Sequence, residues 1–157
     1  MKPGVITDCS DMIPTTDGVA GAPPWTDYTT NASATAIAAA TLTDPTFGDY
    51  FYLGTATKVF YAGGSGTIVV DGSRAGNYTL GANDSWCFEQ FGRSALAATP
   101  TAKIQYQTTM GSGSFADIST APQAKLIKAA SGFVVAFNTS ASTDTWYCSA
   151  IDRKSVV

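Results

Sequence analysis

The chain has 157 residues, a net charge of −3 and a charged fraction of 13%, about half that of an average soluble domain. It contains no histidine, which excludes Ser-His-Asp and Cys-His nucleophile pairs, histidine metal ligands and histidine pH switches. Helical surfaces use Glu, Lys and Arg, and Glu89 is the single glutamate, so a mostly helical fold is not expected. No cluster of Lys and Arg is present, so nucleic acid is not an expected partner.

Residues 1–30 are predicted to form an extended arm, because four prolines and three glycines interrupt them. Asp8, Asp11 and Asp17 lack the spacing of a calcium loop and are interpreted as turn residues. Trp25 follows two prolines outside the repeated strands, and we expect it to anchor the arm on the body or on a neighbouring subunit. Pro23, Pro24 and Trp25 are therefore candidate partner-binding residues. The arm lacks the apolar core of a secretory signal, and no apolar run is long enough to predict a membrane span.

Residues 31–46 form an Ala/Thr-rich connector in this interpretation. Alanine favours a helix, whereas threonine and isoleucine favour a strand. The composition therefore leaves a short helix and an extended segment equally open.

From residue 47 onward, short apolar or alternating runs recur between turn-forming residues, which predicts an all-β fold of antiparallel strands. The expected strands are 50–53, 58–61, 67–71, 86–91, 95–98, 103–107, 115–118, 125–128, 133–138 and 145–150. If Val69, Gln105 and Tyr147 are taken as centres of equivalent strands, the pattern repeats after 36 and 42 residues. This spacing is near that of propeller blades and predicts about three blades over residues 47–151.

Three blades do not close a ring, because propellers contain about four to eight. The sequence therefore predicts an incomplete ring and a fragment of a longer protein, with a compact β-sandwich as the alternative. Residues 152–157, DRKSVV, change the composition abruptly. They are interpreted as a non-native tail that derives from translated adapter sequence, with an ordinary polar C-terminus as the alternative.

Several motifs in a fixed order carry a resemblance that covers most of residues 4–151. They are GVITDCSDMIPTTDGVAGAP, YLGTATKVFYAG, SRAGNY, WCFEQFGRSALAA, SFADISTAPQAKLI, GFVVAFNT and WYCSAI. With them the chain resembles the N-terminal part of a family of virion structural proteins from podovirus-like tailed phages. The family continues with D-x-x-D-W where this chain ends. The resemblance implies a propeller-type protein of the head-to-tail or tail-nozzle region, located in the virion and made in the host cytoplasm. It also implies other virion proteins as partners, in a homo-oligomeric ring, without enzymatic activity or a cofactor.

The residues also allow two other function classes. Asp71, Asp84 and Glu89 could supply the acid and base of a glycan depolymerase, but their turn and strand positions favour structural roles. Aromatic residues could instead form the platform of a glycan-binding adhesin or capsid decoration module, although their place in the strands favours a core. The eight candidate residues of such a platform are Tyr50, Tyr52, Tyr61, Tyr78, Trp86, Tyr106, Trp146 and Tyr147.

Two arginines are further candidates for partner binding, and the three cysteines raise the question of a disulfide. Arg74 and Arg93 follow turns and are predicted to face acidic groups of a partner. Three widely spaced cysteines predict free thiols, with a Cys87–Cys148 disulfide as the alternative.

Overall fold

The computed structural model describes residues 12–15, 18–21, 32, 34–63, 66–130 and 132–149. These residues form β-strands and connecting loops and contain no helix, which confirms the predicted all-β class. Accordingly, this part of the chain contains no helix that could cross a membrane.

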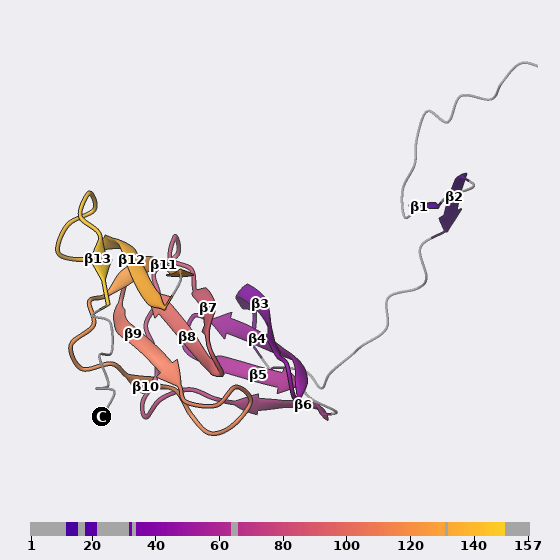
Figure 1. The fold of residues 1–157 in the computed structure, drawn as a ribbon, viewed down its shortest axis with the longest axis horizontal. Coiled ribbons are helices and arrows are strands. Elements are labelled where there is room, and N and C mark those ends of the chain that lie inside the picture. The colour runs from indigo at the N-terminus through magenta and orange to yellow at the C-terminus, as the bar shows by residue number, and fades with distance from the viewer. Residues whose placement is uncertain are drawn as a thin grey trace, which may run out of the picture.

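The strands form three antiparallel sheets and a separate two-stranded hairpin (Figure 1). The hairpin pairs β1 (Met12–Thr15) with β2 (Gly18–Gly21). The first sheet contains β3 (Ala36–Asp44), β4 (Gly48–Thr55), β5 (Val59–Gly63) and β6 (Gly66–Asp71). The second contains β7 (Cys87–Phe91), β8 (Ser94–Thr99), β9 (Ala102–Gln107) and β10 (Ala116–Asp117). The third contains β11 (Ala124–Ala130), β12 (Phe133–Thr139) and β13 (Tyr147–Cys148). In each sheet, strands that are consecutive in the chain are neighbours in space.

The first sheet begins earlier than expected, because most of the connector assigned to residues 31–46 is strand β3. This strand pairs with β4 from Ala36↔Thr55 to Asp44↔Gly48. Leu42 and Asp44 are buried at alternate positions, the pattern of a strand with one face on a core. Pairing and burial therefore decide in favour of the extended form over the helix preference of alanine. Two other strands are shorter than predicted: β10 covers two residues of 115–118, and β13 two residues of 145–150.

The second sheet lies between the other two and is covered on both faces. Ala95 and Ala97 of β8 belong to the core shared with the first sheet. Leu96 and Ala98, at the alternate positions, belong to the core shared with the third sheet. A strand that is buried on both faces has a continuous apolar sequence, as β8 does. The small alanine side chains of β8 allow the neighbouring sheets to approach closely.

Tyrosine hydroxyls in the first core are paired with two buried glutamines. The Tyr52 hydroxyl donates to Gln107 Oε1 at 2.6 Å, and the Tyr78 hydroxyl donates to Gln105 Oε1. Both glutamines are fully buried, and their amide groups satisfy hydroxyls that would otherwise be costly to bury. Burial raises the pKa of Tyr52 and Tyr78 above the usual tyrosine value, so both stay neutral donors.

Polar contacts also join the first strands of neighbouring sheets. Gln90 of β7 accepts from the Thr43 amide at 3.1 Å and donates to the Thr43 carbonyl at 2.9 Å. On the other side, Glu89 of β7 pairs with Lys128 of β11 at 2.8 Å. These contacts fix how the sheets are aligned, whereas the apolar cores supply most of the stability.

Candidate functional site

The predicted partner-binding residues fall into two groups. Pro23, Pro24 and Trp25 lie outside the described residues. Arg74 and Arg93 are described, and each is paired with an acid of the same chain. Arg74 Nη1 contacts Asp117 Oδ2, and its guanidinium lies 5.1 Å from the centre of the Tyr78 ring. The two arginines therefore connect parts of this chain, and a partner's acid would have to compete with these contacts.

Arg93 pairs with a carboxylate that is almost completely buried. Its Nε lies 3.1 Å from Asp44 Oδ2, and the Asp44 side chain is 1% exposed. The amides of Thr46 and Phe47 donate to Asp44 Oδ1 at 2.8 and 3.1 Å. The hydrogen bond from Thr46 is the largest influence on the pKa of Asp44. Together with Arg93 and Phe47 it outweighs desolvation and holds this pKa below its usual value.

The lowered pKa of Asp44 makes stability depend on pH in a defined direction. A carboxyl group whose pKa is lower in the folded state stabilises the fold above its unfolded value of 3.8, and this contribution is lost as pH falls through the folded pKa. We expect Asp44→Asn to lower the free energy of unfolding at pH 7 and to flatten its decrease in acid. Urea unfolding of both proteins between pH 7 and acid measures this. If the free energies of unfolding of the two proteins differed by the same amount at every pH, the prediction would be wrong.

The three carboxylates considered for glycan cleavage do not form a shared site. Asp71 ends β6 and pairs with Lys58 at 3.0 Å, and Asp84 accepts a hydrogen bond from the Gly81 amide in a loop. Glu89 belongs to the second sheet and forms an ion pair with Lys128 of the third sheet. None of them lines the cleft that lies between the second and third sheets.

The two described cysteines, Cys87 and Cys148, are free, so the alternative disulfide between them is absent. Cys9 lies outside the described residues.

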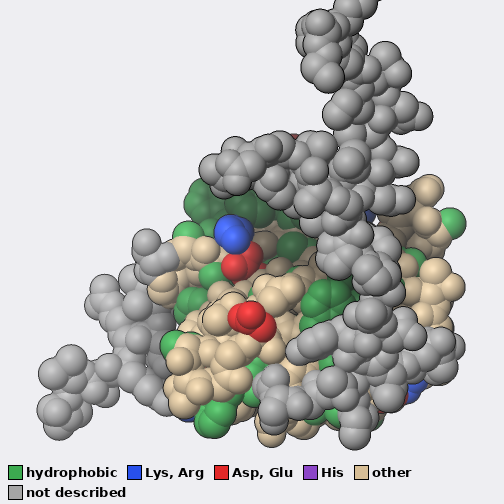
Figure 2. All heavy atoms as spheres, turned by 90° about the vertical axis from the view of Figure 1, so that its right-hand side faces the viewer, with side chains coloured by type: hydrophobic (Ala, Val, Ile, Leu, Met, Phe, Trp, Pro, Cys, Tyr) green, Lys and Arg blue, Asp and Glu red, His purple; other side chains and the backbone are tan. Residues whose placement is uncertain are grey.

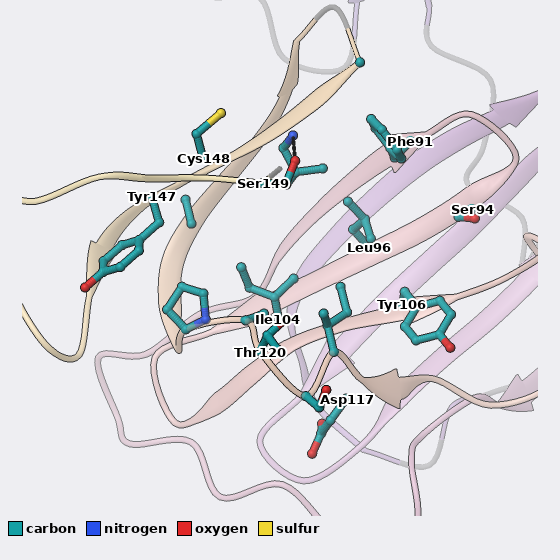
Figure 3. A pocket seen from close by; sticks show the side chains of 17 residues that line it. Phe91, Ser94, Leu96, Ile104, Tyr106, Asp117, Thr120, Tyr147, Cys148 and Ser149 are labelled. Atoms are coloured by element: carbon teal, nitrogen blue, oxygen red, sulfur yellow. Dashed lines mark hydrogen bonds between the residues drawn. The ribbon is translucent and has the colours of Figure 1, made fainter. Parts of the chain in front are cut away.

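A cleft of about 750 Å³ lies between the second and third sheets (Figure 3). The sheets pack closely around Leu96, Ile104 and Ala136, all of which are buried. They separate towards one end of the second sheet, where side chains of the same face become accessible. The lining residues are Phe91, Ser94, Leu96, Ile104, Tyr106, Asp117, Ile118, Ser119, Thr120, Ala121, Pro122, Gly132, Val134, Ala136, Tyr147, Cys148 and Ser149.

Three aromatic side chains line the rim of this cleft. Phe91 and Tyr106 come from the second sheet and are 38% and 39% exposed, and Tyr147 of the third sheet is 42% exposed. Figure 3 shows the two tyrosines on opposite sides, with Ile104 and Thr120 between them. Among the described residues, neither tyrosine hydroxyl has a hydrogen-bond partner. Each ring therefore offers an apolar surface and a free hydroxyl to a ligand.

The cleft carries little charge of its own. Asp117 is its only lining residue with a formal charge, and both of its oxygens are engaged. Oδ2 contacts Arg74, and Oδ1 accepts a hydrogen bond from Gln105 Nε2 at 2.8 Å. In Figure 3 the Asp117 side chain turns away from Tyr106 and Tyr147. The site therefore suits a neutral ligand that has both apolar groups and hydrogen-bond acceptors.

The aromatic residues divide between core and surface. Tyr52, Tyr61, Tyr78 and Trp86 are buried in the first core, which agrees with the expected core role of the aromatic residues. Tyr52 and Tyr61 lie in β4 and β5, whereas Tyr78 and Trp86 lie in the loop between β6 and β7. Tyr106, Tyr147 and Trp146 are exposed. Alternation within β9 separates Tyr106 from its neighbours, because Gln105 and Gln107 face the first sheet. The sequence could have shown this alternation, but not that the third sheet would leave Tyr106 uncovered.

A second accessible feature is the outer face of the third sheet. Leu126 and Phe137 are cross-strand partners on this face and are 55% and 41% exposed. On another side of the molecule, shown in Figure 2, few charged side chains interrupt a surface of hydrophobic and uncharged polar atoms.

No family model matches the chain, and no curated protein matches its sequence.

Proposed function

We propose that the protein is a phage virion structural protein of the head-to-tail or tail-nozzle region that acts through protein–protein contacts. The resemblance of its motifs to podovirus-like virion proteins supports the role. The observation that carries the contact mechanism is the uncovered cross-strand pair of Leu126 and Phe137 on the third sheet. This surface has the character of an interface and not of a catalytic centre.

The three sheets support an assembly role through the way they stack. Packing on both faces of the second sheet buries the apolar residues of β8, whereas the outer face of the third sheet keeps two large apolar side chains in water. Burying them against a further sheet would be favourable, at roughly 25 cal/mol per Å² of apolar surface. We therefore propose a sheet of a neighbouring subunit as the cover.

A propeller-like assembly is compatible with the order of contacts between strands. The first strands of successive sheets contact each other, β3 with β7 and β7 with β11, and each sheet is a meander. Propeller blades are also meanders arranged around a common axis, and about four to eight of them close a ring. Sheets from further subunits would complete such a ring, which makes a homo-oligomer the proposed form.

Self-association of the full chain tests this proposal. We expect sedimentation velocity to show concentration-dependent association that Leu126→Asp abolishes, because a carboxylate would be desolvated at the contact. Thr101→Asp, at an exposed turn position, is the matched control and should associate like the natural chain. A monomer at all concentrations, or equal association of the Leu126→Asp protein, would contradict the proposed self-contact.

A further inference from the structure

The cleft between the second and third sheets has the chemistry of a proline-binding groove. Such grooves use aromatic side chains to hold proline rings, and they recognise a segment that is already extended. Tyr106 and Tyr147 lie on opposite sides of the cleft, and their hydroxyls are free among the described residues. Figure 3 shows each hydroxyl at the outer end of its ring, where it can donate to a backbone carbonyl of a proline-rich segment that crosses the rim, because that conformation forms no internal hydrogen bonds.

The chain itself contains a segment that matches this groove. Residues 22–25 read Ala-Pro-Pro-Trp, and residues 18–26 contain no charged side chain. Each proline ring restricts its own φ to about −65° and restricts the residue before it to extended conformations. The entropy lost on binding is therefore reduced. The Trp25 indole is large and apolar, which suits the floor formed by Leu96 and Ile104.

We propose that the cleft binds residues 22–25 of a second copy of this chain. The position of the cleft favours another copy over the chain's own arm. The arm precedes β3, which belongs to the first sheet, and the second sheet stands between that sheet and the cleft. An arm from a neighbouring copy can approach the open side directly. This inference rests on the proposed assembly role and identifies a second contact, separate from the Leu126–Phe137 face.

A synthetic peptide provides a direct test. The probe is fluorescein-labelled VAGAPPWTDY, the sequence of residues 19–28, and binding is followed by fluorescence anisotropy. The receptor is the full chain carrying Trp25→Ala, so that its own arm competes weakly. We expect saturable binding that Tyr106→Ala and Tyr147→Ala each weaken by about tenfold, as expected for aromatic anchors in an interface. Tyr147→Phe keeps the ring and should lose less.

Two controls keep the result specific. The peptide VAGAAAWTDY lacks both prolines and should bind more weakly, and Phe137→Ala on the outer face should bind the original peptide unchanged. Amide NMR shifts of the Trp25→Ala chain on peptide addition locate the site without cleft substitutions, and they should gather at Ile104, Thr120 and Ser149. Absence of binding, shifts at the outer face, or equal affinity for both peptides would overturn the proposal.

The test separates this inference from the proposed function. If the peptide fails to bind while Leu126→Asp still abolishes self-association, the assembly role stands and the cleft proposal falls. If the peptide binds at the cleft but the chain does not self-associate through the outer face, the cleft contact stands and the proposed sheet contact falls. Binding of a neutral glycan such as lactose at the cleft, with none of the peptide, would favour the adhesin alternative and overturn this proposal.

Discussion

Replacement of Trp86 by alanine is expected to lower the free energy of unfolding by about 3–5 kcal/mol, the usual cost of removing a large buried aromatic side chain. Trp86 is 5% exposed in the core between the first and second sheets. Its ring packs edge-on against Tyr78 at 4.7 Å and parallel to Phe88 at 5.9 Å. Its Nε1 donates to the Thr55 carbonyl at 2.9 Å. The substitution therefore opens a cavity and removes a buried hydrogen bond.

Trp146 provides the matched control for this prediction. It is 63% exposed, and Trp146→Ala should change the free energy of unfolding by no more than about 0.5 kcal/mol, as is usual for surface positions. Urea unfolding followed by far-ultraviolet circular dichroism measures both variants and does not depend on tryptophan emission. Equal effects of the two substitutions would contradict the assignment of Trp86 to the core.

The second large effect is expected at Gly54, which lies against the same indole. A β-carbon at this position would lie 2.1 Å from Trp86 Cδ1 and 2.4 Å from Cγ. The indole is confined by Tyr78 and Phe88 and cannot move aside without disturbing the core. We therefore expect Gly54→Ala to destabilise the fold by about 3 kcal/mol or more, at the upper end of overpacking effects.

A double-mutant cycle tests this cause. If the clash with the indole is responsible, Gly54→Ala combined with Trp86→Ala should be nearly as stable as Trp86→Ala alone. Gly92→Ala is the control, because a β-carbon there meets nothing within 4 Å and only the positive φ of 61° is strained. Its expected cost is about 1–2 kcal/mol. Additive effects of Gly54→Ala and Trp86→Ala would show that steric contact is not the cause.

The cleft illustrates why its residues were hard to recognise from the sequence. In this aromatic-rich chain the pattern predicts a core position for Tyr106 and Tyr147 as much as for Tyr52, because all three occupy strand positions. Strand alternation assigns each side chain to one face of its sheet. It does not show whether another sheet covers that face, because the cover comes from a different sheet, which begins at Ala124, 18 residues after Tyr106. The same limit applies to Arg74, whose carboxylate partner, Asp117, follows 43 residues later.

The sequence by itself determined the all-β class and the approximate places of most strands. Alternating apolar residues, β-branched side chains and turn-forming glycines act locally, so their effect can be read along the chain. Tertiary structure decided the state of residues 36–44, where pairing with β4 outweighs the helix preference of alanine. It also decided which sheet face stays open, because burial of apolar surface depends on the meeting of distant segments. The same long-range packing places Tyr106 and Tyr147 across one cleft and leaves Leu126 and Phe137 exposed on the opposite face of the third sheet.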